Sequence, residues 1–259
     1  MFFTDIPERK ILGTRINLTS YTDACERIFA AIGAEEYGYV AIANVHMVMT
    51  GYWHKKFQTI INQALLTTPD GMPLVLGLRW LGLPAATRVY GPDLTLHCCE
   101  KAAAEKTPVY FYGSRPETLN QLQINLLAQF PQLNIVGTDA PPFRALTPRE
   151  TDAALQRIRQ SGAKLVFVGL GCPKQEQWMH NYTDQLPAVL LGVGAAFDFH
   201  AGTVAQAPRW MMRFGLEWLY RLIQEPQRLW KRYVVNNSAF LLLFAMQLLG
   251  YQWSRRKLS

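Results

Sequence analysis

The sequence is poor in cysteine, and its few cysteines are not spaced for a disulfide scaffold or a structural zinc site. Among 259 residues there is no Cys-x-x-Cys pair and no cysteine with histidine partners at zinc spacing; the four cysteines are Cys25, Cys98, Cys99 and Cys172. Disulfide-stapled domains and zinc modules need such patterns. Free thiols of this kind fit a protein of the reducing cytoplasm.

The first residues lack the pattern of a secretory signal peptide. Asp5, Glu8, Arg9 and Lys10 come before any long apolar run, so we expect no such signal. Charged residues make up 17% of the chain and hydrophobic residues 49%. This balance supports a sizeable core and excludes a disordered chain.

Acidic residues are scarce only near the carboxyl end. Residues 1–203 carry 17 basic and 17 acidic side chains, whereas residues 204–259 carry nine basic and two acidic ones. The net charge of +7 therefore comes from the last segment, which also holds four of the seven tryptophans. Such a segment favours an anionic membrane surface or another polyanion. The neutral remainder argues against a nucleic-acid partner.

Short apolar runs alternate with helical patterns through most of the chain. The predicted strands are residues 39–43, 64–68, 109–112, 134–136, 165–168 and 189–191, and the clearest predicted helices are 92–106, 116–130 and 148–160. Thr147 and Glu150 have the spacing of a capping box, and Ser114 is a candidate cap for the helix at 116. The alternation predicts a Rossmann-like α/β domain, 1–203, with a mainly parallel sheet and helices on both faces.

After Pro208 the strand patterns stop. Residues 208–224 read as one helix, and Pro226 opens another. Residues 233–254 carry no charge, but their dense apolar part, 239–251, is shorter than the ~20 residues of a membrane-spanning helix. We expect 204–259 to form a helical appendage with an interfacial helix that contacts the membrane. A buried helix or an oligomer contact is the alternative.

Polar and glycine residues follow the predicted strands where each one ends. In open α/β sheets, ligands bind beyond the carboxyl ends of the strands. The residues placed there are Asn44, Asp70, Gly113, Ser114, Gln175, Gly192, Gly194 and Asp198. Their agreement predicts a binding site at this edge of the sheet.

Several of these residues have a simpler interpretation. Asp70 with the next glycine could be an ordinary turn, and Ser114 could cap a helix or hold a phosphate at its N-terminus. The glycines at 192 and 194 match part of a dinucleotide fingerprint, but Phe197 replaces the third glycine. His46 and His200 suit packing better than ligand binding, and so does the Cys172 thiol.

No Asp-x-Asp pair occurs in the sequence, so the metal site found in many nucleotide-sugar enzymes is not expected. A diphosphate would then need cationic side chains or helix N-termini. Arg221, Arg228 and Lys231 would share one helical face if the helix continued smoothly past Pro226. A solvated or lipid-facing basic surface is the alternative interpretation.

Six spaced motifs together resemble the WecG/TagA/CpsF family of glycosyltransferases, over about residues 10–232. They are 44–46 (Asn-Val-His), 69–71 (Pro-Asp-Gly), 88–94 (Arg-Val-Tyr-Gly-Pro-Asp-Leu), 171–176 (Gly-Cys-Pro-Lys-Gln-Glu), 192–198 (Gly-Val-Gly-Ala-Ala-Phe-Asp) and 215–222 (Gly-Leu-Glu-Trp-Leu-Tyr-Arg-Leu). The resemblance implies transfer of a sugar from a UDP-sugar to a sugar–diphosphate–polyprenol at the cytoplasmic face of the inner membrane, without a cofactor. N-acetylmannosamine is the first candidate sugar.

The resemblance also implies roles for individual residues. Asp70 matches the general base, Arg88 and Gln175 match site residues, and Arg221 and Arg228 match arginines that hold the diphosphate. At the third basic position stands Lys231, which lacks the bidentate geometry of arginine. The implied reaction inverts the anomeric configuration in one displacement and gives a β-linkage.

Other interpretations remain open from the sequence. Glucose or a mannosaminuronic acid could be the transferred sugar within the same family. A Rossmann-type oxidoreductase would need a full glycine fingerprint early in the chain, and a non-catalytic membrane module would leave the strand-end residues unexplained. A homo-oligomer is compatible with the sequence.

Overall fold

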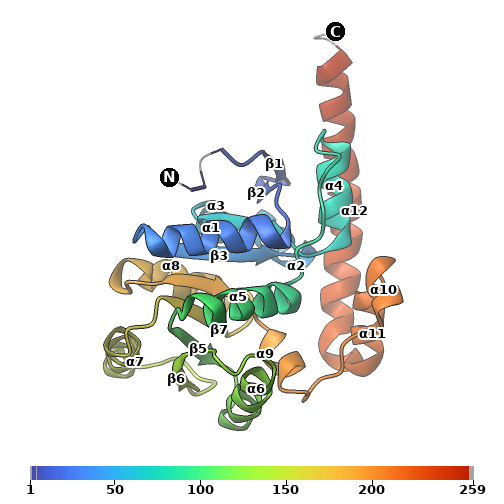
Figure 1. The fold of residues 1–259 in the computed structure, drawn as a ribbon. Coiled ribbons are helices and arrows are strands. Elements are labelled where there is room, and N and C mark those ends of the chain that lie inside the picture. Colours follow the sequence, from blue (N-terminus) through green and yellow to red (C-terminus); the bar gives the residue numbers. More distant parts are fainter. Residues whose placement is uncertain (1, 4, 257–259) are drawn as a thin grey trace.

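A computed structural model of the chain describes residues 2–3 and 5–256; the side chains at 228, 232, 252 and 254–256 lie outside this description. It contains a six-stranded parallel sheet of order β4-β3-β8-β7-β5-β6 and a separate two-stranded antiparallel sheet, β1-β2 (Figure 1). The strands are β1 Glu8–Ile11, β2 Thr14–Asn17, β3 Gly38–Ala43, β4 Leu66–Pro69, β5 Val109–Gly113, β6 Ile135–Asp139, β7 Leu165–Gly169 and β8 Val189–Gly192. The predicted α/β fold is confirmed.

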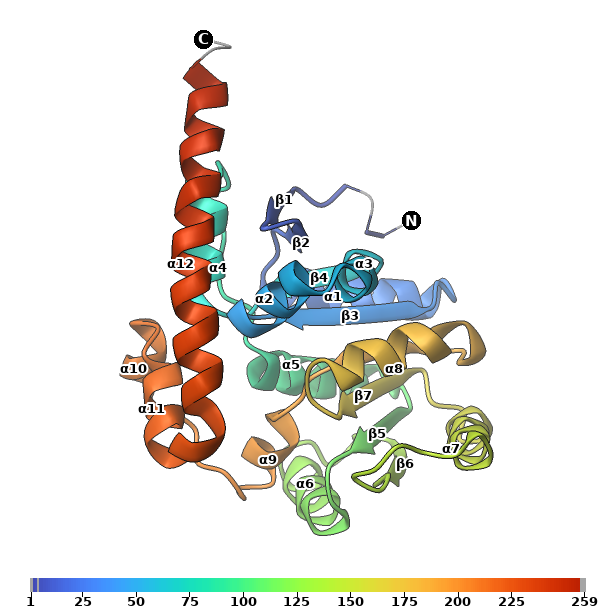
Figure 2. The same cartoon turned by 180° about the vertical axis from the view of Figure 1, so that it is seen from behind.

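Helices cover both faces of the large sheet and form the carboxyl-terminal part of the molecule (Figures 1 and 2). The helices are α1 Tyr21–Gly33, α2 Val45–Trp53, α3 Lys55–Asn62, α4 Met72–Trp80, α5 Gly91–Glu105, α6 Pro116–Gln129, α7 Pro148–Gln160, α8 Lys174–Tyr182, α9 Ala196–His200, α10 Arg209–Arg213, α11 Glu217–Gln224 and α12 Pro226–Arg256, with a short 3-10 turn at Thr183–Gln185. All six predicted strands are present within two or three residues of their expected ends.

Side chains that point alternately to the two faces of the large sheet divide the core into two layers. In β5, Tyr110 and Tyr112 pack with α7 and α8, whereas Val109 and Phe111 pack with α5 and α6 on the opposite face. Successive strand residues point to opposite faces, and both faces of a parallel sheet are usually covered by helices. Because both faces are covered, the strands are continuous apolar runs in the sequence.

Of the two helix caps considered from the sequence, one is present in the structure and the other is not. Thr147 and Glu150 form the predicted capping box at the start of α7. The N-cap of α6 is Arg115, without a side-chain cap bond, so capping, one of the two roles left open for Ser114, is not the one that the structure shows. Ser114 instead has a φ of 62° and its backbone N–H donates to the Gly169 carbonyl at 3.2 Å.

The β1-β2 hairpin was not predicted. Its two turn residues, Leu12 and Gly13, have φ values of 49° and 85°. Positive φ at both central residues is the geometry of a type I′ hairpin turn. The usual Asn-Gly or Asp-Gly signal for this turn is absent, because leucine occupies the first position.

The predicted helix 208–224 is divided into α10 and α11 by a glycine. Gly215 has a φ of 71°, and the N–H of Leu216 donates to the Met211 carbonyl at 2.8 Å. This is the Schellman arrangement that ends a helix at glycine. A second break at Glu225 (φ −131°) separates α11 from α12, so the chain does not continue as one smooth helix past Pro226.

Helix α12 packs along the side of the α/β body with one of its faces (Figures 1 and 2). Phe240 and Phe244 are only 2% and 3% exposed and belong to the same core cluster as α2 and α4. One turn on, the Gln247 amide accepts from the Leu12 N–H at 2.8 Å and donates to the Lys10 carbonyl at 2.6 Å. The boundary predicted at 203/204 stays a prediction, but α12 contributes to the core of the body.

The opposite face of α12 is apolar and exposed. Leu242, Met246, Leu249 and Trp253 recur at intervals of three and four residues and are all largely exposed. Between residues 2 and 256, one segment, Leu229–Tyr251, is long and apolar enough to cross a membrane by length and composition alone. Such a helix is weak evidence for spanning, since core helices of soluble proteins pass the same test.

Candidate active site

Two cavities meet at the carboxyl ends of the strands. The strand-end cavity, of about 1020 Å³, is lined by the segments that follow β3, β4, β5, β7 and β8 and by α11. The α12 cavity, of about 470 Å³, lies between α11, α12 and the first turns of α2 and α4, with a mostly apolar lining. The residues that line both cavities are Asn44, Asp70, Glu217 and Arg221.

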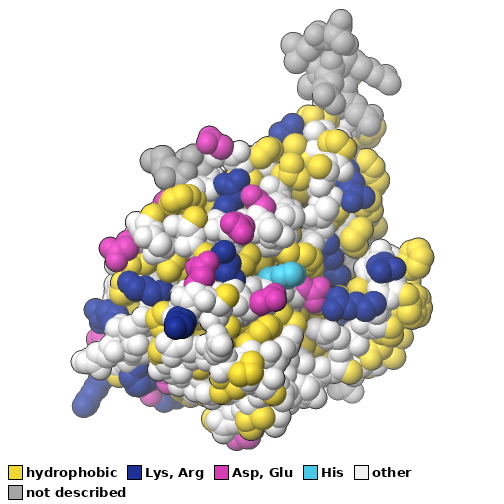
Figure 3. Space-filling view, viewed as in Figure 1, with side chains coloured by type: hydrophobic (Ala, Val, Ile, Leu, Met, Phe, Trp, Pro, Cys, Tyr) yellow, Lys and Arg dark blue, Asp and Glu magenta, His cyan; other side chains and the backbone are white. Residues whose placement is uncertain are grey.

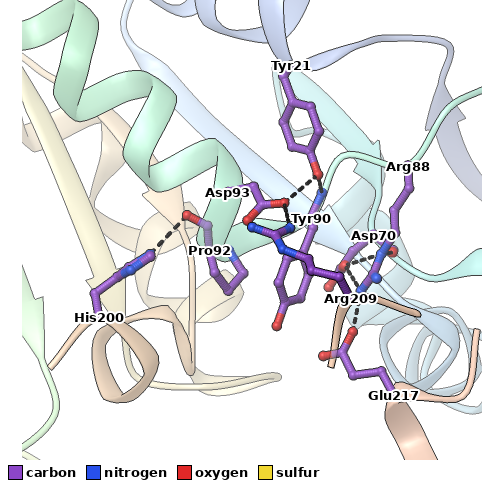
Figure 4. A network of polar contacts seen from close by, with 9 residues as sticks. All are labelled: Tyr21, Asp70, Arg88, Tyr90, Pro92, Asp93, His200, Arg209 and Glu217. Carbon is purple, nitrogen blue, oxygen red and sulfur yellow. Dashed lines mark hydrogen bonds and ion pairs between the residues drawn. The ribbon is translucent and has the colours of Figure 1, made fainter. Parts of the chain in front are cut away.

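Asp70 lies at this junction because it directly follows β4. Its backbone N–H donates to the Ala43 carbonyl at 2.8 Å, which extends the β3-β4 ladder by one residue. Its side chain is 17% exposed and accepts from the Arg88 guanidinium, with Nη2 3.0 Å from Oδ1 (Figure 4). Arg88 Nε also donates to the backbone carbonyl of Asp70. The predicted strand-end carboxylate is thus held between backbone and arginine.

Arg88 is shared with a second carboxylate, from α11. Its Nη2 donates to Glu217 Oε2 at 2.6 Å, and the Glu217 side chain is 15% exposed (Figure 4). Charge-assisted bonds of this kind are short and strong. Arg88 was predicted to be a site residue, whereas Glu217 was not, although it lies within the 215–222 motif.

The surroundings of Asp70 shift its pKa in opposite directions. The net result is a pKa raised to about 6: burial raises it most, the Arg88 guanidinium lowers it, and the negative charge of Glu217 raises it. A carboxylate whose pKa lies near neutrality is a more effective general base than an ordinary aspartate.

Tyr90 was also missed, although it follows Arg88 closely in the chain. Its ring lies under the Arg88 guanidinium at 4.3 Å and packs against Ala207 and Met212 of the carboxyl-terminal part. Its hydroxyl is buried at the strand-end cavity; burial and the nearby Glu217 and Asp70 carboxylates raise its pKa, so the hydroxyl stays protonated and faces Glu217 as a donor. A protonated hydroxyl at this position can donate to Glu217 or to a molecule bound in the cavity.

A second ion pair ties the same segment to α10. Arg209 Nη1 lies 3.0 Å from Asp93 Oδ2, which also accepts from the Tyr21 hydroxyl at 3.3 Å (Figure 4). Burial raises the pKa of Tyr21 to about 12, so its hydroxyl stays protonated and donates. The stretch from Arg88 to Asp93 therefore contacts both α10 and α11.

The three basic residues predicted to hold a diphosphate have different positions. Arg221 lines both cavities; its Nε is buried without a hydrogen-bond partner among the described residues, and its guanidinium lies 5.7 Å from the Phe199 ring. Lys231 is exposed over the Trp230 ring and lines neither cavity, because the break at Glu225 turns α12 away from the line of α11. The Arg228 side chain lies outside the described part of the structure.

Glycines let the strand-end loops approach one another closely. A Cβ at Gly113 would lie 2.6 Å from the Gly169 backbone, and one at Gly192 would lie 2.6 Å from the end of the Met179 side chain. Ser114 Oγ donates to Asp198 Oδ1 at 3.4 Å at the wall of the strand-end cavity, which Gly192 and Gly194 also line. Gly113 itself lines neither cavity.

Gln175 lines the strand-end cavity, but its amide is engaged within its own loop. Its Oε1 accepts from the Gly171 N–H at 3.0 Å and its Nε2 donates to Glu176 Oε1 at 2.8 Å. Glu176 is fully buried, and burial raises its pKa to about 7. The Gln175 side chain therefore shapes the 171–176 loop around the cavity.

Asn44 and the two histidines make contacts that stabilise the fold. Asn44 Oδ1 accepts from the Met47 N–H at 3.1 Å and caps α2. His46 Nδ1 lies 3.0 Å from the Asn236 amide of α12, and His200 Nε2 lies 2.9 Å from the Pro92 carbonyl. Packing of both histidines was predicted. In the part of the chain that the structure describes, no three His, Cys, Asp or Glu side chains are grouped closely enough to hold a metal ion.

A comparison with protein families matches residues 9–254 to the model described as "Glycosyl transferase WecG/TagA/CpsF family". The match covers nearly the whole chain and extends beyond the 10–232 segment in which the motifs were recognised. Much of α12 lies within the matched region, as do both cavities.

Proposed function

The chain belongs to the WecG/TagA/CpsF family of glycosyltransferases of cell-surface polysaccharide synthesis, and from this premise we propose that it transfers a sugar from a UDP-sugar to a polyprenyl-diphosphate-linked sugar. N-acetylmannosamine is the first candidate donor sugar, and N-acetylglucosaminyl-diphospho-undecaprenol is the acceptor type. The observation that carries this proposal is that a polar and an apolar cavity meet at the Asp70 side chain, which lines both.

The strand-end cavity suits the donor. Its volume of about 1020 Å³ is at the upper end of what small-molecule and cofactor sites have, which leaves room for a nucleotide. The first turn of α6 faces it without a side-chain cap, and Ser114 and Gly194 bring backbone close to the space. Uncapped helix N-termini and close-approaching glycine loops bind phosphate groups well. We therefore assign the UDP moiety to this cavity.

The α12 cavity suits a lipid-linked acceptor. Its walls include apolar residues of α12, such as Phe240 and Leu241, and the start of α4, where Gly71 is the N-cap without a side-chain bond. An apolar groove next to a free helix N-terminus and to Arg221 can accept a prenyl chain and a diphosphate together. The acceptor sugar would then lie nearest to Asp70.

The proposed reaction is a single displacement. The Asp70 carboxylate takes the proton from the acceptor hydroxyl while the oxygen attacks the anomeric carbon of the donor. The bond from this carbon to the UDP oxygen breaks, and the leaving diphosphate takes the electron pair. Arg221 and the helix N-termini at the strand-end cavity stabilise the developing charge. An α-linked donor thereby gives a β-linked product.

The test is a screen of UDP-sugars with short-chain prenyl-diphospho-N-acetylglucosamine, measured by release of UDP. We expect UDP-N-acetylmannosamine to give the highest rate, with product retained on the lipid. A higher rate with UDP-glucose or a UDP-mannosaminuronic acid would reassign the donor within the family. No acceptor-dependent release from any UDP-sugar would contradict the proposed function.

Activity is expected to be independent of Mg²⁺ and Mn²⁺. The sequence has no Asp-x-Asp pair, and Arg88 and Arg221 lie at the site as cations. Rates should therefore be unchanged, within about twofold, after treatment with EDTA. A preparation that loses activity in EDTA and recovers it with Mn²⁺ would contradict this expectation.

The protein is further proposed to work at the cytoplasmic face of the membrane as a peripheral protein. Figure 3 shows hydrophobic side chains gathered along α12 and at α10. Trp210, Phe214, Leu242 and Leu249 are among the exposed apolar residues there, and the carboxyl-terminal segment carries the excess of basic residues. Apolar contact together with attraction to anionic lipid gives reversible membrane binding.

A double variant, Leu242→Gln with Leu249→Gln, tests this membrane contact. These side chains are 65% and 68% exposed, so the fold should tolerate the change. We expect binding to phosphatidylglycerol-containing vesicles to fall by roughly tenfold or more, because each leucine would otherwise be buried in lipid. Activity on a short soluble acceptor should stay close to wild type.

The matched control is Ile124→Gln with Leu127→Gln on α6, two exposed apolar residues away from α12. Vesicle binding should be unaffected in this control. If the α12 variant binds vesicles normally but loses an oligomer seen by light scattering, the exposed face of α12 is an oligomer contact instead.

A further inference from the structure

Glu217 and Asp70 bind the same nitrogen of the Arg88 guanidinium. Asp70 belongs to the α/β body and Glu217 to α11, and both accept from Arg88 Nη2, at 3.0 and 2.6 Å respectively (Figure 4). The contact between Arg88 and Glu217 joins residues 129 positions apart in the chain. All three side chains are at least four-fifths buried, so water screens their charges only weakly.

We propose that Glu217 is a positioning residue through which docking of α11 sets the orientation and charge of Asp70, with Arg88 as the intermediary. This inference rests on the proposed role of Asp70 as the base. With α11 docked, the guanidinium is divided between two carboxylates, and Asp70 keeps its strength as a base. With α11 displaced, Arg88 would pair with Asp70 alone. The undivided positive charge would then occupy the carboxylate of Asp70 and make it a weaker base.

The charges around Asp70 decide in which direction loss of the Glu217 charge moves the pKa of Asp70. The charged groups that shift its pKa are Arg88 and, from α11, Glu217 and Arg221. Tyr21 of α1 and Tyr90 interact with the Asp70 charge, and the other titratable residues that line its two cavities are His46, Arg115, Glu117, Cys172, Asp198, Glu225 and Tyr233. Tyr21 and Tyr90 are neutral, since burial raises their pKa values further above neutrality. Arg88 and Arg221 lower the pKa of Asp70, and Glu217 raises it. Removal of the Glu217 charge must therefore lower that pKa.

A purely structural role for Glu217 makes a different prediction. The pair between Asp93 and Arg209, at 3.0 Å, also joins the body to the appendage but does not contact Arg88 or Asp70. If the Glu217 contact only held α11 in place, loss of the Arg88–Glu217 pair and loss of the Asp93–Arg209 pair would both lower activity in the same way, without moving its pH dependence. Asp93→Asn is therefore the matched control for Glu217→Gln.

The experiment compares kcat/KM as a function of pH on a soluble acceptor for wild type, Glu217→Gln, Glu217→Asp and Asp93→Asn. The acid-side midpoint of the wild type is expected near pH 6, where Asp70 loses its proton. Glu217→Gln keeps an acceptor for Arg88 but no charge, and should move this midpoint down by roughly half a pH unit or more. Asp93→Asn and Glu217→Asp should leave the midpoint in place, even if kcat falls.

A titration of Asp70 by ¹³C NMR in protein labelled at aspartate carboxyl carbons supplies a readout that needs no activity. Asp70→Asn identifies the signal, and Glu217→Gln should again lower its midpoint. Unchanged midpoints in Glu217→Gln, or equal displacement in Asp93→Asn, would overturn the inference. Absence of transferase activity in the wild type, with the NMR shift present, would contradict the proposed function and not the coupling.

Discussion

Asp70→Asn is expected to reduce kcat by ~10²–10⁴-fold, the usual contribution of a general base. The asparagine amide has the same shape and can still accept from Arg88, but it cannot take the proton of the acceptor hydroxyl. Affinity for UDP should change little, because the strand-end cavity keeps its glycine loops and helix N-termini. Single-turnover rates and UDP binding by calorimetry measure the two effects separately.

Stability provides a check that the variant is folded. The pKa of Asp70 in the folded protein, about 6, lies above its ordinary value of 3.8, so the folded state binds the proton more tightly than the unfolded state. The stability linked to this group is therefore present at low pH and is lost as pH rises through about 6. A neutral asparagine should not lower Tm at pH 7.5 and should flatten the dependence of Tm on pH between 4 and 7.

The control for this variant is Asp139→Asn, at the end of β6. Asp139 is another strand-end carboxylate, paired with Arg157 at 2.8 Å, but it lines neither cavity. Its loss should leave kcat unaffected. If Asp70→Asn retains turnover within about threefold of wild type, the assignment of Asp70 as the base fails.

The parallel sheet could be predicted because its signals are local. Each buried strand is a short apolar run with a glycine or polar residue at its end, and the capping box of α7 needs only two residues three positions apart. The β1-β2 hairpin could not be recognised in the same way, since Leu12 adopts a left-handed φ of 49° that its residue type does not favour. The division at Gly215 had a local signal, because glycine often ends helices.

The site was predictable to the extent that it is built from strand ends. Asp70, Ser114, Gln175 and Gly194 were expected at this edge of the sheet, and all four line the strand-end cavity. Their individual roles did not follow from position: the Gln175 amide is engaged within its loop.

Residues from the carboxyl-terminal part were harder to assign, because their positions depend on how α11 and α12 pack. Glu217 meets Arg88 only after α11 folds back onto the body, and no spacing in the sequence encodes that contact. From its spacing, Lys231 would share one helical face with Arg221. The break at Glu225 puts the two residues on different helices, so that spacing no longer applies. Tertiary packing, not residue type, decides which basic residue of this segment reaches the cavities.

Arg221→Ala is expected to lower kcat by ~10²–10³-fold, the cost of removing one strong donor to a developing anion. Arg221 lines both cavities, and its Nε is buried with no hydrogen-bond partner among the described residues. A buried guanidinium nitrogen without a partner is unfavourable in the free protein and favourable once an anion binds. KM for the soluble acceptor should rise as well, and Arg221→Lys should recover only part of the loss, because lysine lacks the bidentate fork.

The pH dependence separates Arg221 from Glu217, since the two charges act on Asp70 with opposite sign. The positive charge of Arg221 lowers the pKa of Asp70, so its removal should move the acid-side midpoint of kcat/KM above the wild-type value near pH 6. The deficit of Arg221→Ala should therefore be larger at pH 6 than at pH 8. Arg213→Ala is the matched control, because Arg213 is an exposed arginine of α10 that lines neither cavity. If Arg221→Ala turns over normally on the soluble acceptor, Arg221 does not hold the diphosphate, and Arg88 becomes the first candidate for that role.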